Sequence, residues 1–130
     1  MDENPEYVRR SRDLLSEITV LDSRIEVHVF AGKLEEPDVR RIISRVQSCA
    51  GIQTYPILVV PDKNTKISFF AVKALASEEA MNYAKATAYI IKSFHHQVMA
   101  DALFAMYKLS KPLKVFNDEQ TALKWLGTFV

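Results

Sequence analysis

The chain has 130 residues, of which 48% are hydrophobic and 25% are charged, and its 17 basic side chains nearly balance 16 acidic ones. This length suits one domain that buries about two thirds of its extended surface. With only 3 Gly and 5 Pro, the composition excludes a disordered or collagen-like chain. A net charge of +1 argues against nucleic acid as a partner, because such binding rests on clustered Lys and Arg.

Cysteine content and hydropathy bear on where the protein works. The single cysteine, Cys49, has no second cysteine for an internal disulfide, which suits a reducing compartment. The first residues are acidic, whereas a secretory signal is basic and then apolar. The apolar stretches are interrupted well before the roughly 18 residues needed to cross a bilayer. We therefore expect a cytoplasmic protein without membrane insertion.

Two regions are distinguished along the chain: an amino-terminal arm, residues 1–16, and a folded domain, residues 17–130. Within the arm, the charged stretch from Pro5 to Leu15 carries a thin apolar stripe and is interpreted as a short helix or an ordered arm. The domain begins with residues 17–21 and 25–30, in which β-branched residues alternate with polar ones. Turn-forming residues between these stretches complete a predicted β-hairpin.

A helix is predicted next, between Glu35 and Gly51. Acidic residues and Pro37 suit its first turn, and Gly51 suits its C-terminal cap. Apolar residues recur at the helical spacing i, i+3, i+4 and i+7, and they are Val39, Ile42, Ile43 and Val46. The spacing predicts a helix that covers one face of a sheet.

The middle of the chain predicts two interior strands. Tyr55 to Val60 is a continuous apolar run followed by turn formers, the pattern of a strand buried on both faces, and we expect it to be central. A polar loop, Pro61 to Lys66, follows it, and Ser68 then caps a helix that extends to Ala76. Ala84 to Ile91 is predicted to be the second interior strand.

The last third predicts a helix, a strand and a helix. A long apolar helix covers Phe94 to Leu109, a strand covers Leu113 to Phe116, and Asn117 or Asp118 caps the final helix. Strands that alternate with helices imply a mostly parallel sheet with right-handed crossovers. The opening hairpin adds an antiparallel component.

Four blocks of the sequence together carry a resemblance to a known family: the hairpin, the Tyr55 to Val60 strand, Ala71 to Glu79, and Lys111 to Leu126. They resemble the small bacterial STAS-like or STAS/SEC14-like proteins, which are distantly akin to anti-sigma factor antagonists. The resemblance extends over residues 17–130. It implies a single STAS-like α/β domain with a mixed, mostly parallel sheet of about five strands flanked by four helices, without assigned catalysis.

The resemblance also implies a candidate modification site. In the anti-sigma factor antagonists, the helix after the central strand begins with a phosphorylatable serine on a surface that binds a kinase-like protein partner. Ser68 lies at the corresponding place and is the candidate phosphorylation or partner site. The local sequence favours an ordinary helix N-cap at this position, which contributes about 1 kcal/mol.

Other chemistry-bearing residues have structural interpretations. His95 and His96 are neighbours on a helix, so their imidazoles diverge by about 100°, and no Cys, Asp or Glu stands three or four residues after either to complete a metal site. No metal or cofactor is therefore expected. The arginines of the first helix are interpreted as a solvated face rather than an anion-binding patch, and they are Arg40, Arg41 and Arg45.

The apolar excess of the Phe94 to Leu109 helix is the strongest functional feature, because one sheet face cannot cover so much of its circumference. Three covers are considered: a second copy in a homodimer, a small apolar or lipid-like ligand, and the arm from Pro5 to Leu15. The candidate interface or pocket residues are His95, Met99, Leu103, Phe104 and Tyr107.

These features favour a non-enzymatic interaction or regulatory module, acting as a homodimer or with a protein partner. The alternative is a binder of a small apolar or lipid-like ligand. An enzyme ranks third, since the sequence holds no glycine-rich phosphate loop and no group of residues with catalytic spacing.

Overall fold

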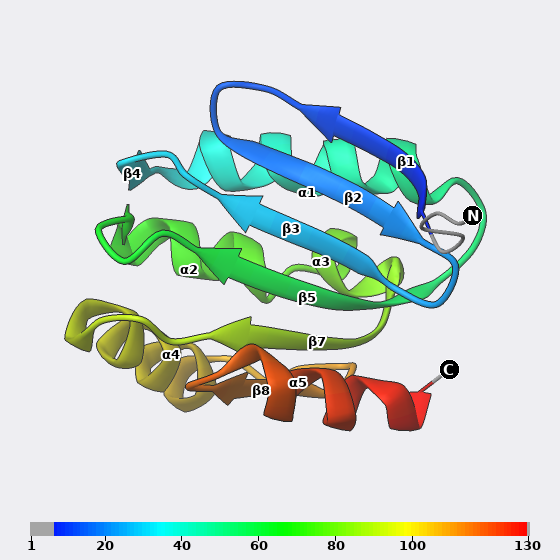
Figure 1. Cartoon of the computed structure of the whole chain (residues 1–130). Helices are drawn as coiled ribbons and strands as arrows, with labels where there is room; N and C mark the ends of the chain where they lie inside the picture. Colours follow the sequence, from blue (N-terminus) through cyan, green and yellow to red (C-terminus); the bar gives the residue numbers. More distant parts are fainter. Residues whose placement is uncertain (1–6, 130) are drawn as a thin grey trace.

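Six strands pair into one sheet in the order β1-β2-β3-β5-β7-β8 in the computed structural model, which describes residues 7–129 (Figure 1). These strands are β1 (Tyr7–Arg12), β2 (Ser16–Leu21), β3 (Ile25–Val29), β5 (Tyr55–Pro61), β7 (Ala84–Ile90) and β8 (Leu113–Phe116). β2 runs antiparallel to both of its neighbours, β1 and β3, and β3, β5, β7 and β8 are mutually parallel. Two short strands, β4 (Lys33–Leu34) and β6 (Lys66–Ile67), form a separate parallel pair.

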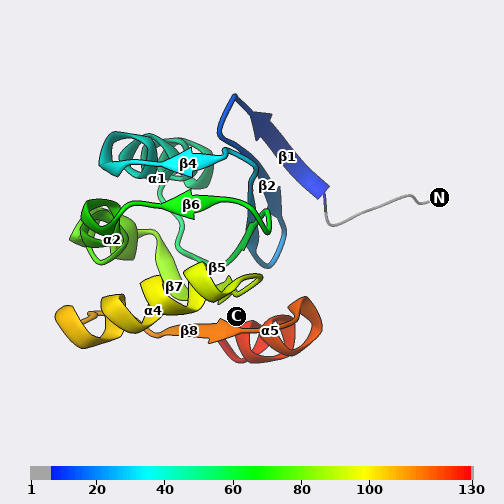
Figure 2. The same ribbon diagram turned by 90° about the vertical axis from the view of Figure 1, so that its left-hand side faces the viewer.

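The helices lie on both faces of the sheet. They are α1 (Glu36–Ala50), α2 (Phe69–Leu75), α3 (Glu78–Asn82), α4 (Phe94–Met106) and α5 (Glu119–Leu126), and a 3₁₀ turn, Gly127–Phe129, follows α5. Figure 2 shows α1, α2 and α4 on one side of the sheet, together with β4 and β6, and α5 on the other. The predicted mixed, mostly parallel α/β fold is confirmed, and the fifth helix, α3, is a single short turn.

Local chemistry explains where the helices begin. α1 has a capping box in which the Glu35 and Asp38 side chains bond each other's backbone N–H, and proline stands in its first turn. At the start of α2, α3, α4 and α5, one side-chain oxygen accepts the backbone N–H three residues later, and these caps are Ser68, Ser77, Ser93 and Asp118. Each cap satisfies a backbone donor that the helix leaves free.

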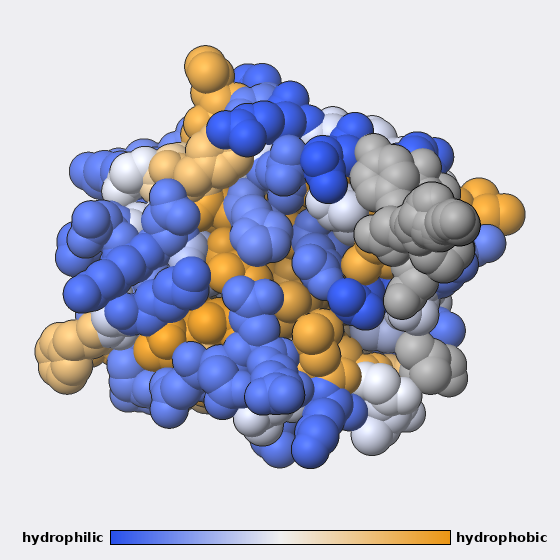
Figure 3. Space-filling model, in the orientation of Figure 1, coloured by the Kyte–Doolittle hydropathy of each residue, from blue (hydrophilic) through white to orange (hydrophobic). Residues whose placement is uncertain are grey.

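The core is divided by the sheet. On one face, α1 covers the inward residues of β2 and β3, among them Ile18, Ile25 and Val27, each no more than 2% exposed. On the other face, α5 packs Ala122 and Leu126 against β5 and β7. The face of β2 and β3 that points away from α1 is not covered by a helix, and polar residues alternate along it. Figure 3 views the molecule from this side and shows mainly hydrophilic residues there.

Four sequence expectations are corrected by the fold. The sequence predicts a short helix or an ordered arm from Pro5 to Leu15, but Tyr7–Arg12 is strand β1, paired with β2. Pro5 and Glu6 lie outside the described residues. β1 lies at the sheet edge opposite β8, so Tyr7–Arg12 does not cover the apolar helix α4. The long helix ends at Met106 rather than Leu109, and the expected loop from Pro61 to Lys66 ends in strand β6.

None of the helices within residues 7–129 combines the length and the hydropathy that a membrane-spanning segment needs.

Candidate functional site

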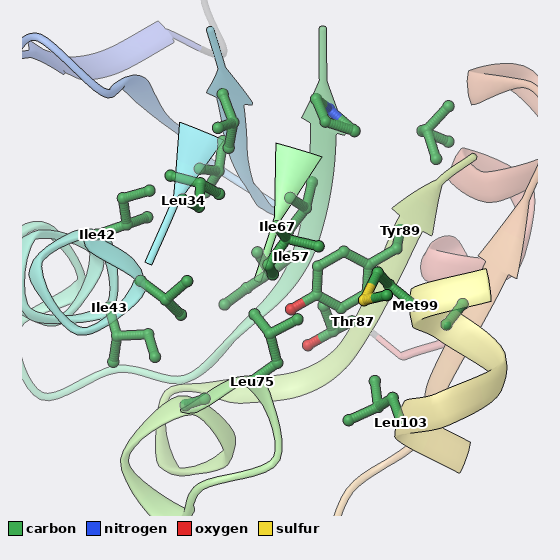
Figure 4. Close-up of a pocket in the computed structure, with 18 of the residues that line it drawn as sticks. Leu34, Ile42, Ile43, Ile57, Ile67, Leu75, Thr87, Tyr89, Met99 and Leu103 are labelled. Carbon is green, nitrogen blue, oxygen red and sulfur yellow. The ribbon is translucent and has the colours of Figure 1, made fainter. Parts of the chain in front are cut away.

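A cavity of about 160 Å³ lies between the sheet and the helices α1, α2, α3 and α4 (Figure 4). Its walls are mostly apolar side chains that converge from elements far apart in the sequence. Ile42 and Ile43 come from α1, Leu75 follows from α2, and Met99 and Leu103 come from α4. Apolar walls of this kind, with a few polar groups, are typical of small-molecule sites.

The floor of the cavity is formed by the two central strands. Alternate residues of a strand point to opposite faces, so Ile57 and Val59 of β5, with Thr87 and Tyr89 of β7, all face the helices α1 to α4. Leu58, on the opposite face, is 0% exposed beneath α5. Val59 and Tyr89 are only half-buried although their strands are interior, because the cavity adjoins them.

Two hydroxyl groups stand on this floor without a protein partner. Neither the Thr87 nor the Tyr89 hydroxyl makes a hydrogen bond to any group within residues 7–129, and Figure 4 shows both pointing into the cavity on the side where Leu75 lies. Burial raises the pKa of the Tyr89 hydroxyl, which therefore stays neutral and able to donate. Buried tyrosine hydroxyls usually have partners, so this pair marks a site for a polar atom.

Other polar side chains that line the cavity are already satisfied. The Thr65 hydroxyl donates to the Ala31 carbonyl at 2.7 Å, and Tyr83 accepts from the Gln47 amide. The carboxylate of Glu79 pairs with Arg40 at 3.0 Å, near the surface. Among the described lining residues, the polar side chains without any protein hydrogen-bond partner are thus those of Thr87 and Tyr89 on β7.

His96 also lines the cavity, and both of its ring nitrogens are used. Nδ1 accepts the Lys92 backbone N–H at 3.1 Å, and Nε2 lies 2.9 Å from the Thr65 carbonyl, to which it donates. Burial lowers the pKa of His96, the Thr65 hydrogen bond opposes this effect, and the nearby charges of His95, Lys66 and Lys92 reinforce it. His96 is therefore a neutral structural residue at neutral pH.

The predicted interface or pocket residues separate into three places. Met99 and Leu103 line the cavity. His95 accepts the Ile67 backbone N–H at 2.9 Å and so attaches α4 to β6. Phe104 is 44% exposed on the outer side of α4, and Tyr107 caps the end of that helix. They therefore do not form one surface.

The outer side of α4 is apolar but interrupted. Phe94 is 83% exposed, and Val98, Phe104 and Met106 are also exposed. Between them, Gln97 donates to the Asp101 carboxylate at 2.9 Å. The expected apolar excess is thus present, spread around the helix rather than gathered in one stripe.

Ser68 caps α2 and also contacts a carboxylate. Its hydroxyl oxygen accepts the Ala71 backbone N–H at 3.2 Å. The pKa of Glu35 is lowered mainly by a hydrogen bond from Lys33 and, second, by a hydrogen bond from Ser68. A phosphoryl group on Ser68 would therefore lie close to a negative carboxylate, which disfavours it. Phosphorylation of Ser68 stays a prediction.

The arginines of α1 are paired with carboxylates of the same chain. Arg40 bonds Glu36 at 2.9 Å, and Arg41 and Arg45 bond the two oxygens of Asp13 at 2.9 and 3.0 Å. Burial alone would raise the pKa of Asp13, but its backbone hydrogen bonds and these two arginines outweigh burial and lower it. The two pairs with Asp13 fasten α1 to the turn between β1 and β2, whereas the Arg40–Glu36 pair lies within α1.

No group of His, Cys, Asp and Glu side chains within the described part of the chain is arranged to hold a metal ion. The two imidazole rings of His95 and His96 have centroids 6.2 Å apart and bond different backbone groups.

Sequence reasoning missed Thr87 and Tyr89. The available signal was a pair of hydroxyl residues two positions apart, and so on one face, within a strand of otherwise small or apolar residues. That pattern alone does not separate a cavity from a hydrogen-bonded core pair.

The comparisons with known proteins bear on fold and family. A family model described as "Domain of unknown function (DUF7793)" matches residues 29–130. The chain belongs to the DUF7793 family. Among solved structures, this DUF7793 chain is similar to an uncharacterized protein from the DUF3478 family with a SpoIIAA-like fold, from Shewanella loihica PV-4. A comparison with curated proteins gives no match.

The similarity to the Shewanella protein supports the fold alone. The two chains are 19% identical, the alignment covers 91% of the DUF7793 chain and 90% of the other, and the TM-score is 0.50. The STAS-like fold expected from the sequence is thereby confirmed, since the DUF7793 domain shares the SpoIIAA-like arrangement.

Proposed function

We propose that this STAS-type domain is a non-enzymatic module that binds a small, mainly apolar molecule in the cavity between its sheet and α4. The observation that carries the proposal is the cavity itself, about 160 Å³ with apolar walls and with two hydroxyls on its floor that have no partner within the described chain. Sites of this composition usually hold small molecules.

The energetic cost of the cavity supports this proposal. Protein interiors are close-packed, and voids larger than a water molecule are few. The space of about 160 Å³ is partly open to solvent, so its apolar lining makes fewer van der Waals contacts than the side chains of a packed core. A ligand that fills it recovers contacts that the apo domain lacks, which is a physical reason for a domain to retain such a space.

A cavity-filling substitution tests this function. Ala100 lines the cavity from α4, whereas Ala105 is exposed on the same helix, so Ala100→Leu and Ala105→Leu are a matched pair. Calorimetric titration with toluene should detect binding to the wild type and to the Ala105 variant, and at least ten-fold weaker binding to the Ala100 variant. Ala80→Leu fills the cavity from α3 and serves as a second variant if the first does not fold.

Two results would refute the proposal: no toluene binding to the wild type, or unchanged binding to the folded cavity-filled variants. Native mass spectrometry of the protein purified from its own host adds an independent readout. A discrete added mass supports the proposal, and its disappearance in the Ala100 variant identifies the cavity as the site.

Self-association through α4 is the second candidate function, favoured by the exposed apolar residues on its outer side. Phe94, Val98 and Phe104 are 83%, 39% and 44% exposed. A homodimer, or a protein partner, would cover them and give the domain the interaction role expected from the sequence. Phe104→Glu should then convert dimers to monomers in light scattering, with Thr121→Glu on exposed α5 surface as the control. A dimer that survives Phe104→Glu excludes this face.

A further inference from the structure

The polar groups of the cavity identify the chemistry of its ligand, an inference that rests on the function proposed above. The relevant groups are the hydroxyls of Thr87 and Tyr89, which are neighbours on one face of β7. A hydroxyl both donates and accepts hydrogen bonds. An oxygen of either kind on a ligand, hydroxyl or carbonyl, therefore meets a complementary partner there.

The cavity offers nothing to a charged group. Among residues 7–129, no Lys or Arg side chain lines it, and the one lining carboxylate, Glu79, is already paired with Arg40. His96 uses both ring nitrogens and would lose the Lys92 hydrogen bond if it became protonated. Burial of an unpaired charge costs far more than one hydrogen bond recovers. We therefore expect the cavity to reject a ligand that must bury a carboxylate, phosphate or ammonium group in it.

The volume of the cavity limits the size of the ligand. An apolar cavity of about 150 Å³ is known to accommodate benzene, and the cavity here measures about 160 Å³. A single six-membered ring with one or two small substituents matches this volume. Met99, an unbranched and adaptable side chain, forms part of the wall and adjusts to the outline of a ring.

We propose that the cavity takes an uncharged, single-ring molecule that is mainly apolar and carries one oxygen, with that oxygen bonded to the hydroxyls of Thr87 and Tyr89. The ring lies against the apolar walls that Leu75, Met99 and Leu103 provide. The proposal concerns binding alone and includes no covalent step.

Calorimetric titrations with three probes of similar size test this inference: toluene, phenol and benzoate. The wild type should bind phenol and toluene but not benzoate. Tyr89→Phe should weaken phenol binding about five-fold, the value of one hydrogen bond, and leave toluene within about two-fold. Thr87→Val should also weaken phenol binding and leave toluene binding little changed. Tyr55→Phe, whose hydroxyl bonds Gln53 at the surface, is the control and should change neither affinity.

The outcomes separate this inference from the proposed function. If toluene binds but phenol affinity is unchanged in both Tyr89→Phe and Thr87→Val, the oxygen assignment is wrong and the apolar site remains. Benzoate binding as tight as phenol binding overturns the exclusion of charge. If none of the probes binds, the proposed function fails together with the inference drawn from it.

Discussion

Replacing Tyr89 with phenylalanine should stabilise the ligand-free protein, the reverse of what most buried substitutions do. The change deletes one oxygen that makes no hydrogen bond within the described chain and keeps the ring that lines the cavity. A buried hydroxyl without a partner costs about 1 to 3 kcal/mol. Because Tyr89 is half-buried beside the cavity, the lower end applies, and the free energy of unfolding should rise by about 1 kcal/mol.

Urea unfolding at pH 7, followed by circular dichroism, measures this change, and thermal unfolding provides a second reading. The entropy of unfolding is about 2.1 cal/mol/K per residue, so for 130 residues a change of 1 kcal/mol corresponds to about 4 °C in Tm. In the control, Tyr55→Phe, the lost hydroxyl donates to Gln53 at 2.8 Å near the surface, and stability should fall by no more than about 0.5 kcal/mol.

The sign of the change in the free energy of unfolding shows whether the Tyr89 hydroxyl has a hydrogen-bond partner. A satisfied hydroxyl contributes about 0.5 to 1.5 kcal/mol, so its removal destabilises. If Tyr89→Phe lowers the free energy of unfolding by that amount, the Tyr89 hydroxyl is hydrogen-bonded in solution and the reasoning about unpartnered groups in the cavity is wrong.

Three further predictions concern pH and packing. Because burial lowers the pKa of His96 below its ordinary 6.5, the folded protein should be fully stable above pH 6.5 and lose stability as the pH falls below 6.5. In His96→Gln, the urea midpoint should fall less steeply with decreasing pH than in the wild type. The surface control His28→Gln should follow the wild type. Because the pKa of Asp13 is lowered from 3.8, its contribution to folding stability is present above that pH and is lost as the pH falls below it. Asp13→Asn removes a carboxylate paired with two arginines and should cost about 1 to 3 kcal/mol of stability at pH 7. The loss of stability at acidic pH should then be less steep than in the wild type. Leu58→Ala, at 0% exposure, should cost about 3 kcal/mol in chemical denaturation, whereas Phe70→Ala, at 77% exposure, should change stability by less than about 0.5 kcal/mol.

Elements with a regular pattern could be predicted from the sequence. The continuous apolar run of β5 and the helical spacing in α1 each correspond to one way of burying side chains, so their type and place follow directly. Strand β1 could not be recognised, because Arg9, Arg10 and Arg12 dominate an edge strand whose pairing is decided by its neighbour. β4 and β6, two residues each, are too short to show any period.

The candidate site was only half accessible to sequence reasoning. The composition of α4 indicated that Met99 and Leu103 need a cover, and the structure places both beside the cavity. The opposing wall depends on how far α4 stands from β7, and that distance follows from packing between segments remote in the chain. For this reason the hydroxyls of Thr87 and Tyr89 were recognised only in three dimensions.

The arginines on β1 also restrict how copies of the protein associate. An open sheet edge invites a further strand, and charged side chains on an edge oppose such pairing. β1 carries three arginines in six residues, and the other edge, β8, has only four residues with the exposed Lys114 among them. Growth into fibrils by strand addition is therefore disfavoured at both edges of the sheet, and copies that do associate must use a face of the domain rather than an edge.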